Sequence, residues 1–144
     1  MLTVERYTER EFLDAEFPDG EPVVEGLLYK GQNVLFVAPQ KSAKTMFSQQ
    51  LALAVAHGVP FLKWGVHRPQ RVLAILCEGT NDELQDILRR QTRALGLEEE
   101  GCLTVVRTPY LHLNTEQGEG TLRALLETEH PDLLILDPFY RLHK

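Results

Sequence analysis

Short apolar runs alternate with segments of helical periodicity along this sequence, and the alternation limits the possible folds more than any other feature. The apolar runs are VLFV, RVLAILCE, LTVV and LLILD, at 34–37, 71–78, 103–106 and 133–137. Short apolar runs of this kind are typical of buried strands. Because helical patterns lie between them, the sequence predicts an α/β fold in which a mostly parallel sheet is covered by helices.

The three intervening segments carry start and stop signals for helices. The first, KTMFSQQLALAVAH, is followed by Gly58, which is placed to cap it. In the second, Thr80 and Glu83 have the spacing of a capping box, and an apolar stripe ends at Gly96. The third, TLRALLETEH, is stopped at 130–131 by a His–Pro pair. Each signal predicts one helix between two strands.

Composition and charge narrow the class of protein. Residues 1–22 are polar and acidic, so we expect an N-terminal arm there and one core domain over 23–144. The formal charge of −6 argues against a surface that is basic throughout, as a general nucleic-acid footprint would be. No run approaches the ~20 apolar residues of a membrane span, and no signal peptide begins the chain. We expect a cytoplasmic protein without membrane association.

Cysteine and histidine residues point to no metal or disulfide chemistry. Cys77 and Cys102 lie in or beside apolar runs and lack CxxC spacing, so we expect buried, reduced thiols. The five histidines are scattered, with no two at metal-ligand spacing on one element.

The loop after the first apolar run has the frame of a phosphate-binding loop. The usual pattern is G-x-x-x-x-G-K-[ST], in which backbone N–H groups and a lysine hold phosphate and a hydroxyl binds Mg²⁺. Residues 38–45 have the length of this pattern and end in its lysine and threonine, but alanine stands in place of both glycines. The candidate phosphate-binding residues are Ala38, Pro39, Gln40, Lys41, Ser42, Ala43, Lys44 and Thr45. Taken alone, these residues are also compatible with an ordinary helix start that carries lysines.

Two carboxylates follow other predicted strands. Asp137 ends LLILD, a pattern that presents a carboxylate to Mg²⁺, although a turn aspartate before proline would look the same. Glu78 ends RVLAILC and could polarise an attacking water as general base, although it could also be an ordinary acidic residue at a helix start. Because the carboxyl ends of parallel strands share one sheet edge, we expect both carboxylates to lie near the loop.

Together these motifs resemble the RecA-like ATPases, and most closely the branch of RepA-type hexameric replicative helicases. The resemblance covers roughly residues 23–140. It rests on the GLLxxG approach to the first strand, the KSxKT loop, the segments LALAVAHGVPFL and RVLAILCEG, the helix ELQDILRR and the segment PDLLILDP. It implies a three-layer P-loop NTPase core.

The resemblance implies a role for each matching residue. Lys44 would contact the β- and γ-phosphates of ATP and take part in catalysis, and the backbone of 39–45 would wrap the phosphates. Thr45 would ligate Mg²⁺, and Asp137 would hold it through water. Glu78 would be the catalytic carboxylate. Family members act as homohexamers, so a homo-oligomer is expected, and DNA is a possible partner.

Two departures from the family pattern affect these expectations. Ala43 stands where glycine lets the backbone approach phosphate, and alanine at φ > 0 costs roughly 1–2 kcal/mol. The sequence ends seven residues after Asp137, whereas the resemblance implies further strands beyond it. We therefore expect a core truncated after the strand LLILD, which resembles the family's Walker B strand, with an open sheet edge that a second copy or a partner completes.

The leading hypothesis is an ATP-binding RecA-like core of a DNA-related ATPase, of replicative-helicase or DNA-remodelling type. The alternative is a non-catalytic relative that serves as a regulatory or interaction module with a degenerate phosphate loop. A sugar or nucleoside kinase is a weaker third hypothesis, because the sequence shows no clear lid.

Overall fold

The structure, a computed structural model, describes residues 3–39 and 41–142. The elements are α1 (Glu9–Asp14), β1 (Pro22–Val24), β2 (Leu28–Tyr29), α2 (Lys44–His57), β3 (Val72–Leu76), α3 (Asn81–Ala94), β4 (Leu103–Arg107), α4 (Glu116–Glu129), β5 (Leu133–Asp137) and the short 3₁₀ turn η1 (Phe139–Leu142). Helices and parallel strands alternate from α2 onward, as the sequence predicts.

A parallel sheet of order β4-β3-β5 forms the centre of the molecule. Leu76 at the end of β3 pairs with Arg107 of β4 on one side and with Asp137 of β5 on the other. The carboxyl ends of all three strands therefore lie level with one another. This confirms the predicted α/β class, and the arrangement fits a RecA-like P-loop fold.

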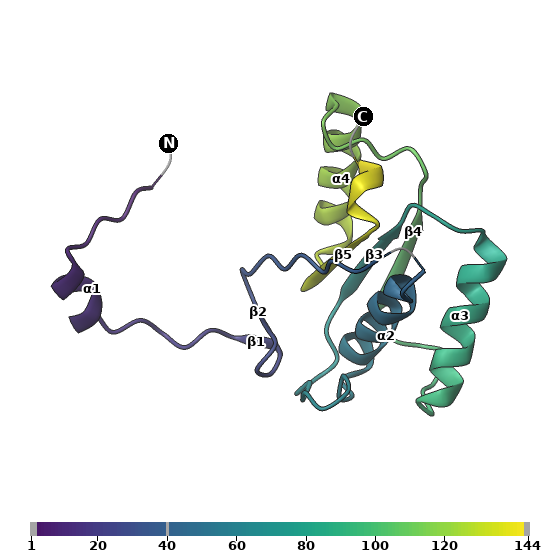
Figure 1. Cartoon of the computed structure of the whole chain (residues 1–144), viewed down its shortest axis with the longest axis horizontal. Helices are drawn as coiled ribbons and strands as arrows, with labels where there is room; N and C mark the ends of the chain where they lie inside the picture. Colours follow the sequence, from purple (N-terminus) through teal and green to yellow (C-terminus); the bar gives the residue numbers. More distant parts are fainter. Residues whose placement is uncertain (1–2, 40, 143–144) are drawn as a thin grey trace.

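Helices cover both faces of this sheet, which makes three layers (Figure 1). Alternate residues of β3 point to opposite faces. Leu73 and Ile75 pack in a cluster with α4 leucines, whereas Val72 and Ala74 belong to clusters with α2 and α3 residues. All five residues of β3 are buried. The central strand β3 therefore supplies most of the buried residues that the sheet adds to the hydrophobic core.

One predicted strand is absent. Residues 34–37, VLFV, run as an extended segment between β2 and α2 without strand pairing. Their exposed fractions are 68%, 73%, 52% and 78%. Phe36 stacks on Phe47 of α2, with ring centroids 4.4 Å apart. The prediction of a buried strand was wrong, because an apolar run becomes a strand only where a neighbouring strand supplies the hydrogen bonds.

The predicted ends of α2 and α4 and the predicted start of α3 are confirmed, but α4 begins at Glu116, five residues before the predicted segment TLRALLETEH, because Thr115 caps it there. Gly58 caps α2 in the left-handed conformation at φ 67°, and its N–H donates to the carbonyl of Ala54. Thr80 and Glu83 form the predicted capping box of α3. His130 ends α4 at φ 44° before Pro131. Local residue chemistry is sufficient to determine these ends.

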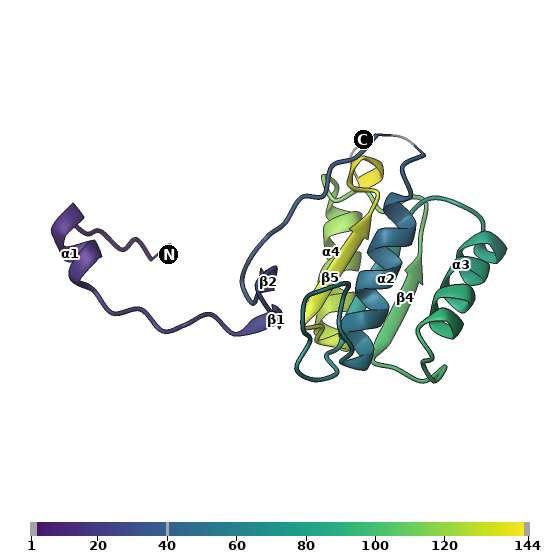
Figure 2. The same ribbon diagram turned by 60° about the horizontal axis from the view of Figure 1, so that its bottom comes forward.

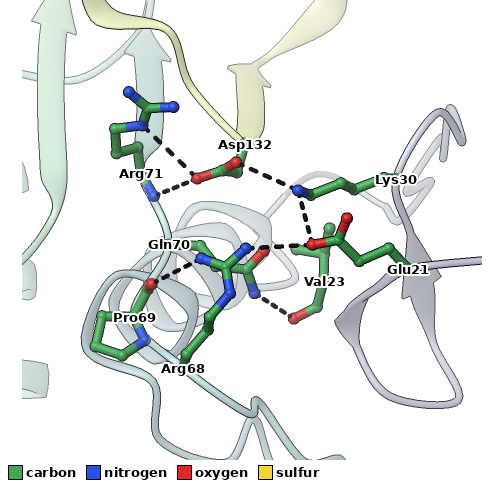
Figure 3. Close-up of polar contacts among 8 residues, drawn as sticks. All are labelled: Glu21, Val23, Lys30, Arg68, Pro69, Gln70, Arg71 and Asp132. Carbon is green, nitrogen blue, oxygen red and sulfur yellow. Dashed lines mark hydrogen bonds and ion pairs between the residues drawn. The ribbon is translucent and has the colours of Figure 1, made fainter.

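The β1–β2 hairpin is attached to the sheet layer by apolar packing and by an ionic network. Val23, Val24 and Leu28 are buried in the cluster that contains α2 residues. Around this cluster Lys30 bridges the carboxylates of Glu21, at 2.8 Å, and Asp132, at 3.7 Å (Figure 3). The remaining members of the network, also drawn in Figure 3, are Arg68 and Arg71 with their carboxylate partners, and Gln70, which donates to the carbonyl of Val23.

Residues 3–21 extend away from the sheet and its helices (Figure 2). They include α1, whose capping box is formed by Thr8 and Glu11. The rings of Tyr7, Phe12 and Phe17 contact one another there, with centroids 5.2–6.1 Å apart. This cluster gives the segment some order of its own.

The two cysteines differ in environment. Both are free thiols, but only Cys77 is buried, whereas Cys102 is exposed. The expectation of burial was therefore wrong for Cys102, which lies just before β4 rather than within it. Within residues 3–39 and 41–142, no helix is long and apolar enough to cross a membrane.

Candidate nucleotide-binding site

The loop at 38–45 leads directly into the first turn of α2. Gln40, one of the predicted phosphate-binding residues, lies outside the described residues. Lys41 and Ala43 have left-handed backbones, with φ of 60° and 62°. The Lys44 Nζ donates to the carbonyl oxygens of Ala38, at 2.7 Å, and Pro39, at 2.9 Å. The lysine is thus folded back across its own loop, close to the N-terminus of α2.

The N-terminus of α2 lacks the neutralising groups that the other helices have. Ala43 precedes the helix without a side-chain cap, and no acidic residue lies in the first turn. The other three α-helices begin with a threonine cap and two acidic residues in the first turn; the caps are Thr8, Thr80 and Thr115. An open helix start carries partial positive charge and unpaired N–H groups, to which Lys44 adds a full charge. This donor set suits a phosphate group.

Asp137 lies against the same helix. Its Oδ2 accepts a hydrogen bond of 3.0 Å from the Ser48 hydroxyl, which also lies 3.0 Å from the carbonyl oxygen of Thr45. Ser48 was not predicted as a site residue. Its position three residues after Thr45, on the same helix face, is the sequence signal that could have identified it. The structure therefore brings the turn that holds Thr45 to the carboxylate of Asp137.

Glu78 follows β3 beside Asp137, since the N–H of Cys77 donates to the Asp137 carbonyl at 2.8 Å. Its Oε1 accepts hydrogen bonds from the Tyr140 hydroxyl and from Nε of Arg141, the latter at 2.9 Å. The bond from Tyr140 is the main cause of a lowered pKa for Glu78, burial acts against it, and the charges of Arg141 and Lys44 lower it further. Glu78 is therefore a carboxylate at neutral pH.

Arg107 fixes the turn that carries Glu78. Its guanidinium donates to the carbonyl oxygens of Leu76, Glu78 and Gly79, and its Nε donates to Asn81 at 2.9 Å. These bonds join the ends of β3 and β4 to the start of α3. Sequence reasoning gave Arg107 no role, because only the parallel register shows that the last residue of β4 lies beside that turn.

The described members of the predicted site thus lie at one end of the sheet. Lys44, Asp137 and Glu78 come from three different segments, and the structure brings them to the same edge. A single carboxylate is sufficient for Mg²⁺, which usually keeps several waters and takes its remaining ligands from substrate phosphates. The carboxylate of Asp137, which lies against the α2 turn that holds Thr45, fits that ion.

A parallel α/β sheet with a lysine-bearing loop before a helix, and carboxylates at the strand ends, defines a P-loop ATPase-like domain. Comparison with protein families agrees: the family model described as AAA domain matches residues 3–144. The chain belongs to the AAA domain family, which implies nucleotide binding. Searches against curated proteins and against solved structures gave no significant match.

Proposed function

We propose that this chain binds MgATP in the loop at 38–45 and is the nucleotide-binding core of a DNA-related ATPase. The observation that carries the proposal is the uncapped start of α2, where the charge of Lys44 acts on Glu78 and Asp137 lies against the same helix. An ATP phosphate would provide the negative charge that the other helix starts receive from their own acidic residues.

Each predicted residue has a role in this proposal. Lys44 leaves the carbonyls of Ala38 and Pro39 to bind the β- and γ-phosphates, and the loop N–H groups bind the same oxygens. Thr45 ligates Mg²⁺, which neutralises charge on the phosphates, and Asp137 holds it through water. The proposed chemistry is attack of water on the γ-phosphorus: the new P–O bond forms, the bond to the β–γ bridging oxygen breaks, and Glu78 accepts the proton of the water.

The DNA-related part of the proposal is supported by the motifs that this sequence shares with RepA-type helicases. A homo-oligomer, hexameric as in that branch, or a partner that adds to the sheet would suit the outer edge of β5. Within the described residues, β5 pairs with β3 alone. An unpaired edge offers its backbone groups to a further strand.

Calorimetric titration with MgATP tests the binding step. We expect saturable binding by the wild-type chain and its loss in Lys44→Ala, because the variant lacks the phosphate-facing charge. Lys63→Ala is the matched control, since Lys63 lies over the Trp64 ring, outside the candidate site. A folded wild-type chain that shows no heat of binding at millimolar MgATP would overturn the proposal.

A second function, a non-catalytic module of the same fold, is favoured by the strained Ala43. The two functions differ in hydrolysis, so release of phosphate from bound ATP distinguishes them. Single-turnover release that depends on Glu78 supports the ATPase. Tight binding without release supports the module.

A further inference from the structure

The turn η1 places two hydrogen-bond donors on one oxygen of Glu78. The Tyr140 hydroxyl and the Arg141 Nε both donate to Oε1. The guanidinium of Arg141 also lies over the Tyr140 ring, 5.5 Å from its centroid. The two donors therefore support each other as well as the carboxylate.

This turn is fixed to the rest of the fold. Leu142 is fully buried in the cluster that contains Leu111, and its carbonyl accepts the N–H of Leu113 at 2.7 Å. Within the turn, the N–H of Arg141 donates to the carbonyl of Pro138. The turn begins two residues after Asp137, so the donors to Glu78 and the proposed Mg²⁺ carboxylate belong to one short, anchored segment.

The second carboxylate oxygen of Glu78 is in a different situation. Within the part of the chain that the structure describes, no hydrogen bond or ion pair reaches Oε2, and the side chain is 41% exposed. Water can therefore approach this oxygen. With both donors on Oε1, rotation of the carboxylate is restricted and the orientation of Oε2 is set.

We propose that Tyr140 and Arg141 are positioning residues: they anchor Oε1 of Glu78 so that Oε2 is presented to the water that attacks ATP. This inference rests on the proposed function, because it assigns the two residues to the ATP-hydrolysis step. A general base must be held within hydrogen-bonding reach of the proton that it accepts, and small misplacements cost much of the rate. Neither residue touches ATP in this proposal; both act through Glu78.

The anchoring itself can be tested without ATP. The side-chain carboxyl signal of Glu78 in a ¹³C-glutamate-labelled sample is assigned by its loss in Glu78→Gln. We expect Tyr140→Phe and Arg141→Lys each to shift this signal at pH 7. Tyr110→Phe and Arg90→Lys are matched controls that leave it unchanged, because Tyr110 lies in another loop and Arg90 pairs with Asp86 on the surface of α3. An unchanged Glu78 signal in Tyr140→Phe and Arg141→Lys overturns the anchoring.

The role in hydrolysis is tested by separating binding from turnover. We expect Tyr140→Phe and Arg141→Met to lower kcat about tenfold to a hundredfold, with KM and the Kd for MgATP changed less than about twofold. Arg141→Lys should recover part of the loss, because it keeps the charge. A purely structural role would instead lower the unfolding midpoint. The midpoint is expected to stay constant, since both side chains are more than half exposed.

The possible failures are distinguishable. A wild-type chain that does not bind MgATP overturns the proposed function, and with it the role in hydrolysis, whereas the Glu78 signal still reports the anchoring. If MgATP binds but is not hydrolysed, or if kcat is unchanged or raised in the variants, the positioning role is overturned and MgATP binding stands.

Discussion

At the residue scale, Ala43 is the most informative position in the loop. The sequence shows alanine where the motif has glycine, and the structure gives this alanine a φ of 62°. The left-handed conformation costs an alanine roughly 1–2 kcal/mol relative to its ordinary backbone. Because the strain belongs to the backbone of the loop itself, it lowers the stability of the fold.

We expect Ala43→Gly to raise the free energy of unfolding by about 1 kcal/mol, since relief of strain exceeds the added freedom of the unfolded chain. Urea denaturation measures this. The same substitution at Ala124, an exposed position inside α4, should lower stability by about 1 kcal/mol, because glycine is a poor helix former. Equal effects at both positions would show that Ala43 is not strained.

At the element scale, the glycines that follow α2 and α3 are required to different degrees. Gly58 after α2 and Gly96 after α3 both have positive φ, 67° and 64°. A Cβ on Gly58 would lie 2.5 Å from the backbone nitrogen of Pro69, whereas a Cβ on Gly96 would meet nothing within 4 Å. Of these two glycines, only Gly58 lies close to another backbone segment, in the connector between α2 and β3.

We therefore expect Gly96→Ala to cost about 1 kcal/mol of unfolding free energy, from backbone strain alone. Gly58→Ala should cost about 3 kcal/mol or more, because overpacking against an immobile backbone is added to the strain. Thermal or urea unfolding of the two variants measures the difference. Similar losses in both would mean that the connector moves aside freely.

At the scale of the whole molecule, the network around Asp132 joins segments that are distant in the sequence. Asp132 lies just before β5. Its Oδ2 accepts a hydrogen bond of 3.0 Å from the N–H of Arg71, which lies just before β3. Its other oxygen pairs with Lys30, after β2. Burial raises the pKa of Asp132, but the hydrogen bond from Arg71 and the charge of Lys30 outweigh it, so the pKa is below the ordinary value of 3.8.

We expect Asp132→Asn to lower stability by about 1–2 kcal/mol at pH 7, since hydrogen bonds to charged groups contribute more than neutral ones. A carboxyl whose pKa is lowered on folding stabilises the fold above its unfolded pKa, and this contribution is lost as pH falls through its folded pKa. The deficit of the variant should therefore be full above about pH 4 and shrink at lower pH. Urea unfolding across this range measures it.

Asp86→Asn is the control for a solvent-exposed ion pair, because Asp86 and its partner Arg90 are both more than half exposed and lie beyond the first turn of α3. Such pairs contribute little to stability, so the control should be nearly neutral at every pH. If Asp132→Asn behaved in the same way, the contacts of Asp132 would contribute no more to stability than an exposed ion pair does.

The sequence by itself determined α2, α3, the C-terminal end of α4 and three of the strands, but not α1, the β1–β2 hairpin or the start of α4. Caps such as Thr80 with Glu83, stops such as Gly58 and buried runs such as 133–137 are local features, and local chemistry decides them. The position of the loop before a helix and of Glu78 and Asp137 after strands also followed from the sequence. Because parallel strands end at one sheet edge, the sequence also predicted that the two carboxylates lie at the same edge. The phosphate-binding and metal-binding roles of these residues stay predictions.

Only the tertiary structure decided which residues contact one another. VLFV has the composition of a strand, but strand formation needs a hydrogen-bonding neighbour, and no strand among the described residues pairs with it. The donors that hold Glu78 and Asp137, namely Tyr140, Arg141 and Ser48, are 62, 63 and 89 residues away from the groups they bind. Contacts over such separations arise from packing of the sheet and helices. A local pattern can single out Ser48 beside Thr45, but it cannot show that Asp137 lies against it.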